Sequence, residues 1–281
     1  MKLQLLRTKK SRLAVWLGGL AVLGIYLFAQ RPVPLAHIEG AGNTIPIEVV
    51  FRALAAENDA ARGLYTKDIV EAGLKAGLRF AENWREPSAN AGPLPALFLR
   101  ETAGAIHKSG VPLSLFLGSD FPIAQANLFS GKQSAHFRLL RQSSKPEFFY
   151  ASDLKLHTAM FPDIVVAQAC ATCHNEHPKS PKTDWKLGDI MGATTWAYPK
   201  KKVSLHEALQ IISSFRQSIA LAYDAYLKKA SGFERAPEIG ERWPKEGRYL
   251  PSTHVFVREM ERRASPTTLA SLLKATQQSN P

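Results

Sequence analysis

Residues 170–199 read CATCHNEHPKSPKTDWKLGDIMGATTWAYP, and the first five of them contain both cysteines of the chain. Cys170 and Cys173 are three positions apart, so one helical turn places both thiols on the same face. This C-x-x-C-H spacing is the attachment signature of a c-type haem. His174 would then lie under the porphyrin as the proximal axial ligand of the iron. The motif therefore predicts one covalently bound haem c, held by Cys170, Cys173 and His174.

Three other uses of the two thiols have to be weighed. A thioredoxin-like redox couple shares the spacing, but it belongs in a βαβ pattern that the surrounding sequence does not show. A zinc site could include His177 as a third ligand, yet its fourth ligand would have to come from far along the chain. A plain disulfide would suit an oxidising compartment. Haem attachment is favoured, because the chain has no other cysteine to give either thiol a different partner.

The quoted stretch also carries a second set of characteristic positions: Asn175, His177–Pro178, Ser180–Lys182, Asp184–Lys186, Gly188–Asp189 and Gly192. With these positions it resembles a bacterial c-type haem domain of PAS-like fold, formerly catalogued as a domain of unknown function. That domain occurs as the extracytoplasmic sensing part of histidine kinases, nucleotide cyclases and chemotaxis receptors. The resemblance extends upstream, more loosely, to about Pro95. It implies a PAS-like sheet that holds one haem, with His174 as proximal ligand.

The chain departs from the sensor members of this family after Pro199. Those members continue through a second membrane helix into a cytoplasmic output domain. The residues after Pro199 are too few for a kinase or cyclase, and Arg216 and Asp224 interrupt the apolar stretch that follows. We therefore expect any signal to pass to a separate protein.

The N-terminal region predicts a membrane anchor. Residues 1–12 contain five basic residues and no acid, and residues 13–29 (LAVWLGGLAVLGIYLFA) carry no charge. A helix of that length spans about 25 Å, at the short end of what crosses a bilayer. A cleaved signal peptide has the same plan, but no convincing small-x-small cleavage site is present. The basic flank predicts an inner-membrane location with one N-terminal anchor and the haem domain in the periplasm.

Between and beyond these motifs, apolar spacing predicts an α+β fold. Helices are expected at 46–60, 66–82, 96–108, 205–229 and 253–263, and strands at 113–117, 148–151, 164–166 and 190–198. The predicted architecture is an N-terminal membrane helix, a PAS-like antiparallel sheet with helices around one haem, and a helical C-terminal extension. The expected parts are a basic flank and anchor (1–30), a linker and helical segment (31–94), the PAS-like haem domain (95–199) and the helical extension (200–281).

The sixth position of the iron would decide the function. A strong protein ligand there favours electron transfer, and an open or weakly held position favours binding of a small molecule. Met160 and His157 are the preferred candidates because they lie in the segment that enters the haem motif. His136 and Met191 are the other candidates.

Further residues are candidates for the walls of the haem site. Trp185 and Trp196 could pack against the porphyrin, although ordinary core packing would explain both. Arg138 and Arg141 could donate hydrogen bonds to the haem propionates, although a solvated basic surface is the alternative.

Composition narrows the function further. The net charge is +12, but the basic flank supplies part of it, and no basic motif interleaved with aromatic residues supports nucleic-acid binding. The leading hypothesis is haem-based sensing of redox state or of a diatomic gas. The alternative is a tethered electron-transfer cytochrome, and a peroxidase-like enzyme is the least favoured. The membrane, a separate signalling or redox protein and a second copy of the chain are the expected partners.

Overall fold

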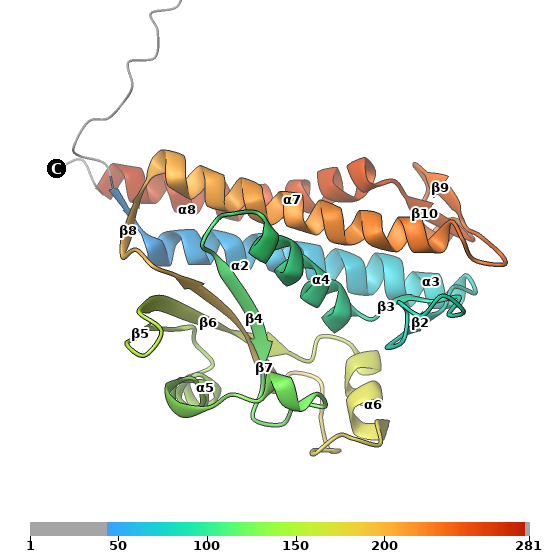
Figure 1. Cartoon of the computed structure of the whole chain (residues 1–281), viewed down its shortest axis with the longest axis horizontal. Helices are drawn as coiled ribbons and strands as arrows, with labels where there is room; N and C mark the ends of the chain where they lie inside the picture. Colours follow the sequence, from blue (N-terminus) through green and yellow to red (C-terminus); the bar gives the residue numbers. More distant parts are fainter. Residues whose placement is uncertain (1–43, 279–281) are drawn as a thin grey trace, which may run out of the picture. The chain divides into compact units, whose positions relative to one another are not determined.

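The computed structural model describes residues 44–278, in which long helices pack against a small sheet (Figure 1). The helices are α2 (Ile47–Leu64), the π-helix η1 (Tyr65–Glu71), α3 (Ala72–Lys75), α4 (Pro95–Lys108), the 3-10 helix η2 (Gln125–Asn127), α5 (Gly131–Ser143), α6 (Gln168–Glu176), α7 (Leu205–Ala230), the 3-10 helix η3 (Pro244–Glu246) and α8 (Thr253–Gln278). The strands are β1 (Thr44–Pro46), β2 (Phe80–Ala81), β3 (Gly92–Pro93), β4 (Ser114–Gly118), β5 (Glu147–Ala151), β6 (Leu156–Ile164), β7 (Ile190–Tyr198), β8 (Lys202–Ser204), β9 (Glu238–Gly240) and β10 (Tyr249–Pro251).

The largest sheet has the strand order β4-β7-β6-β5, and all its neighbouring strands are antiparallel. Successive side chains of a strand point to opposite faces. Trp196 and its cross-strand neighbours Leu115 and Ala159 therefore share one face and join the main core. Met160 and Ala193 face the other way and pack with Phe137 and Leu140 of α5 and with Phe129. The sheet thus lies between the long helices and α5, which confirms the α+β class and the antiparallel sheet.

The helices α2, α4 and α7 lie against one face of the sheet, and α8 packs on α2 and α7 (Figure 1). Trp196 of β7 is fully buried and meets Phe215 of α7 edge to face, with 5.1 Å between ring centroids. Tyr65 stacks on Phe98 with centroids 4.1 Å apart. Burying a large apolar side chain of this kind stabilises a fold by about 1.5–3 kcal/mol. These contacts join the helices and the sheet into one core.

The helices after residue 200, which the sequence predicts as a helical C-terminal extension, belong to this core. Ser204 caps α7 as its capping box indicates, since its Oγ accepts a hydrogen bond from the Glu207 amide at 3.1 Å. From there α7 buries Ile211, Phe215 and Tyr223 in the main core. The extension was expected because local periodicity reveals an apolar face but does not reveal what covers it.

The predicted membrane anchor at 13–29 lies outside the described residues. Within residues 44–278, no helix is both long enough and apolar enough to cross a bilayer. The architecture with an N-terminal membrane helix, and the inner-membrane location derived from it, are therefore corrected. What the structure describes is an α+β fold of sheets and helices.

Candidate haem-attachment site

Helix α6 carries the whole Cys-x-x-Cys-His motif. The helix follows β6 after a short connection, and it ends where the amide of His177 donates to the carbonyl of Cys173 at 3.0 Å, just before Pro178. Both thiols are free, with Cys170 partly buried and Cys173 exposed. The spacing and the short helix therefore present two unpaired thiols one turn apart, as two thioether bonds require.

The surroundings of the thiols argue against a thioredoxin-like couple. Burial is the largest cause that raises the pKa of Cys170, and Asp163 adds to it. Burial also leads in raising the pKa of Cys173, with further contributions from Glu82 and Glu176. A reactive redox cysteine needs the opposite, a lowered pKa that gives a thiolate at neutral pH. These thiols are accordingly protonated near pH 7.

His174 has the protonation state that a metal ligand needs. Burial lowers its pKa below the usual histidine value, although the charge of Asp163 opposes the shift. The imidazole is therefore neutral at pH 7, and a neutral imidazole can ligate a metal. Its Nδ1 atom is buried without a hydrogen-bond partner. An unpaired buried polar atom is uncommon in a finished fold, and it fits a site whose ligand orients this ring.

An apolar cluster lies beside the first cysteine. Val165, Ala171 and Trp185 are buried together, and Cys170 packs against them. The partly buried Phe121 and Met191 pack on the same cluster. Phe121 meets Trp185 edge to face with ring centroids 6.3 Å apart. The Nε1 atom of Trp185 is buried without a partner, so this wall also has an unused donor.

The loop after α6 is fastened by the residues that carry the family resemblance. The Asn175 side chain donates from Nδ2 to the Trp185 carbonyl at 3.0 Å, and its Oδ1 accepts from the Trp185 amide at 2.8 Å. Asp189 accepts from the amide of Lys186 at 2.9 Å, next to Gly188, whose φ of +88° favours glycine. This part of the pattern therefore holds Trp185 against Cys170.

His177 has a structural role in the same loop. Its Nδ1 accepts from the Lys179 amide at 3.1 Å, and its Nε2 lies 3.1 Å from Oε1 of Glu82. Both ring nitrogens are thus used by the protein, which leaves no lone pair for a zinc ion. Within residues 44–278, no group of three or more His, Cys, Asp or Glu side chains could hold a metal.

The candidates for the sixth ligand are spread over the molecule. Met160 is fully buried in the cluster against α5. His157 packs on Tyr150 at the far end of β6, which a rise of about 3.3 Å per residue places about 20 Å along the strand from Asp163. His136 stacks on Phe149 with centroids 3.8 Å apart. Among these candidates, Met191 is the one that packs on the cluster beside Cys170.

The remaining predicted wall residues also separate. Trp185 lies beside Cys170, whereas Trp196 lies in the main core against α7. The guanidinium of Arg141 lies 5.6 Å from the ring centroid of Phe121, at the edge of the cluster beside Cys170. Arg138 is exposed on α5 and donates to Ser134 at 3.1 Å. The structure therefore brings Trp185 and Arg141 toward the motif.

Two charged residues near the motif were not foreseen. Asp163 is 7% exposed and pairs with Arg62 at 2.5 Å between Oδ1 and Nη2. A buried acid seven residues before Cys170 could have been suspected from the sequence. Arg62 could not, because it lies 101 residues away and no local pattern connects the two.

The matched segment of a known family coincides with this site. Residues 122–199 match the model of the Tll0287-like family, which comprises c-type haem domains of PAS-like fold. The segment runs from the loop after β4 to the end of β7 and includes α5 and α6. The family suggests a haem-binding sensory domain. No curated protein and no solved structure matches the chain.

Proposed function

We propose that the segment matching the Tll0287-like family binds one haem c covalently through Cys170 and Cys173, with His174 as proximal ligand. The observation that carries this proposal is α6, which presents two free thiols one turn apart and a neutral histidine directly after them. The unpaired Nδ1 of His174 supports it. The raised thiol pKa values speak against a thiolate-based alternative.

The protein around α6 would position this group. Trp185, Phe121 and Met191 supply apolar surface beside Cys170. Arg141 supplies a cation at the edge of that surface, where a propionate could pair with it. When bound, the haem supplies a one-electron couple and an iron that can take a small axial ligand. The chain itself would hold the porphyrin through Cys170 and Cys173, and burial keeps His174 neutral.

We infer that the site serves sensing of redox state or of a diatomic gas. Electron carriers favour charged, lysine-rich edges that steer a partner protein. The acids Glu82 and Glu176 lie near the exposed Cys173 instead, and Lys182 is paired with Asp184 and lies over the ring of Trp185. A separate signalling protein would receive the output, and a second copy of the chain could pair with the first.

Electron transfer remains the second candidate, and one observation favours it. Met191 packs on the cluster beside Cys170, so it is positioned better than Met160 or His157 to become a sixth ligand. A methionine opposite a histidine raises the reduction potential of a c-type haem.

The first test is haem attachment to the full chain, expressed with a cytochrome c maturation system. We expect a haem stain that survives a denaturing gel and a pyridine haemochrome spectrum of the c type. The double variant Cys170→Ser with Cys173→Ser should lose both, because no thioether can form. His157→Ala is the matched control and should keep both. A wild-type chain without covalent haem would refute the proposal.

Ligand binding then separates the two candidate functions. We expect the reduced protein to bind CO, with a shifted Soret band, because a sensor keeps its sixth position open or readily displaced. A low-spin, six-coordinate spectrum that ignores CO would instead establish electron transfer. In that case Met191→Leu should produce a high-spin iron, and Met160→Leu should leave the spectrum unchanged.

A further inference from the structure

A buried ion pair connects the strand that enters the haem motif to the longest helical segment before it. Asp163 lies near the end of β6, five residues before α6 begins, and its side chain is 10% exposed. Arg62 lies in the last turn of α2, with its side chain 26% exposed. The two meet at 2.5 Å between Nη2 and Oδ1. A charged hydrogen bond with this little solvent is screened weakly.

The ion pair lies close to the residues that would hold the haem. The register between β6 and β7 shifts between Asp163 and Ile164, an irregularity that redirects side chains and is common beside functional sites. The charge of Asp163 acts on both His174 and Cys170, and Arg62 also acts on Cys170. Both members of the pair are therefore within electrostatic reach of the motif.

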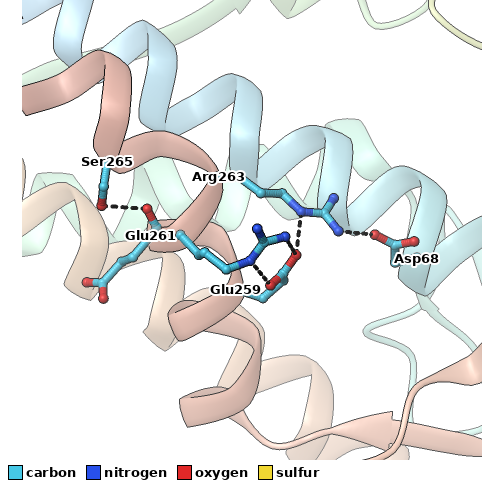
Figure 2. Close-up of polar contacts among 6 residues, drawn as sticks. Asp68, Glu259, Glu261, Arg263 and Ser265 are labelled. Carbon is cyan, nitrogen blue, oxygen red and sulfur yellow. Dashed lines mark hydrogen bonds and ion pairs between the residues drawn. The ribbon is translucent and has the colours of Figure 1, made fainter. Parts of the chain in front are cut away.

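The helical segment that follows Arg62 is unusual. Three residues after Arg62 the α-helix becomes the π-helix η1, which is followed by α3. π-helical turns are rare and occur often at functional sites. Asp68 of η1 pairs with Arg263 of α8 at 2.8 Å, and Arg263 also pairs with Glu259 (Figure 2). Ion pairs thus connect the end of α2 to β6, through Arg62, and connect η1 to α8, through Asp68.

We propose that the Arg62–Asp163 ion pair couples the charge of the haem site to the end of α2 and to η1. This inference rests on the proposed function, since it requires a haem on α6. Reduction transfers one electron to the ferric iron from a one-electron donor protein, and no bond is made or broken. The charge of the site falls by one, so the attraction between Asp163 and the site weakens while its attraction to Arg62 remains. Coupling is reciprocal, so the ion pair also sets the reduction potential.

The reduction potential provides the first readout. Asp163→Asn removes a negative charge that stabilises the ferric site, so its potential should rise. Arg62→Gln leaves that charge uncompensated, so its potential should fall. Each shift should be at least tenfold in the equilibrium, about 59 mV for a one-electron couple. Arg62→Lys, which keeps the charge, should stay near the wild type.

The control for these shifts is an exposed arginine–carboxylate pair in another part of the fold. Glu238 of β9 pairs with Arg242 of the following loop, at 2.7 Å between Oε1 and Nη2. Glu238→Gln breaks this exposed pair and should leave the reduction potential unchanged. Opposite shifts for Asp163→Asn and Arg62→Gln are not expected from general loosening of the fold. If one of these two variants fails to fold, the shift in potential of the other still tests the inference.

Hydrogen exchange provides the second readout, in the full-length haem protein. We expect the amides of residues 61–71 to differ in protection between the oxidised and reduced wild type, and this difference to disappear in Asp163→Asn. Variants that carry covalent haem but match the wild type in potential and in exchange would overturn the inference alone. A wild-type chain that carries no haem would overturn both the inference and the proposed function.

Discussion

Glu57 shows how a single buried charge joins the helices. It lies on α2 with no solvent exposure, and its carboxylate accepts two hydrogen bonds from Arg216 of α7, at 2.6 and 3.0 Å. Thr268 of α8 donates a third at 2.8 Å. Arg216 also donates to Glu261 of α8 at 3.1 Å. The carboxylate is thus fully paired, which a charge at such depth requires.

We predict that Glu57→Ala destabilises the fold. The change leaves Arg216 with a weaker set of partners and Thr268 without its acceptor. Removing one member of a buried ion pair costs about 3–5 kcal/mol. Because Arg216 keeps Glu261 and some contact with water, we expect a loss of about 3 kcal/mol in the free energy of unfolding, measured in urea.

The matched control for this variant is Glu238→Ala. Glu238 and Arg242 form an ion pair with both side chains largely exposed, at 66% and 47%. Exposed pairs contribute about 0–1 kcal/mol. A Glu57→Ala protein that is no less stable than Glu238→Ala would show that the buried pair does not hold the helices together.

Among the elements, the strands β4, β5 and β7 were predicted best. The expected strand at 190–198 is β7, and those at 113–117 and 148–151 agree with β4 and β5 within one residue. The strand expected at 164–166 is wrong: the true strand, β6, is Leu156–Ile164. Its residues His157, Pro162 and Asp163 break the apolar pattern, and the polar group of Asp163 becomes buried only in the fold.

The first two expected helices are one continuous helical segment. A break was predicted between 60 and 66, but α2, η1 and α3 follow one another without interruption over 47–75. The predicted break falls where the π-helix η1 begins, and η1 continues the helix with i→i+5 hydrogen bonds instead of ending it.

The ion pairs of Glu259 on α8 predict that the stability of the fold depends on pH. The hydrogen bond from Arg262, assisted by the one from Arg263, lowers the pKa of Glu259 to about 2 from an ordinary value of 4.5. A carboxyl whose folded pKa is depressed stabilises the fold above its unfolded pKa. This contribution should therefore be present above about pH 4.5 and be lost as the pH falls toward 2.

Comparison of the wild type with Glu259→Gln tests this dependence. The two unfolding free energies should differ at pH 6 and converge as the pH falls to about 2, in thermal or urea unfolding. Glu241→Gln is the control, because Glu241 meets Arg258 at 3.5 Å with both side chains mostly exposed. A constant difference between wild type and Glu259→Gln across this range would contradict the assignment.

Over the whole molecule, the segment 122–199 that matches the family model shares one core with the long helices. Trp196 of the matched segment packs on Phe215 of α7, and Tyr198 of β7 donates to Glu207 of α7 at 2.6 Å. β8 pairs with β1 just before α2 begins, so the chain returns to its first described strand. Residues 122–199 alone therefore lack the helix that buries one face of their sheet.

Truncation tests this dependence. A chain that ends at Pro199 loses α7 and α8, which exposes Trp196, Leu115 and the buried face of α2. We expect it to lose cooperative urea unfolding and to bind a hydrophobic dye, whereas the full chain unfolds in one transition. A chain ending at Pro199 that unfolds cooperatively would establish that the sheet and α2 form an independent domain.

The sequence by itself determined the α+β class and the candidate thiols and histidine of the site. The reason is local: the spacing of Cys170, Cys173 and His174 and the short apolar runs of the strands depend on neighbouring residues alone. Only the tertiary structure decided which distant residues meet the motif. Arg62 reaches Asp163 and α7 covers Trp196 because burial of apolar surface folds remote segments together, and local periodicity carries no information about that pairing.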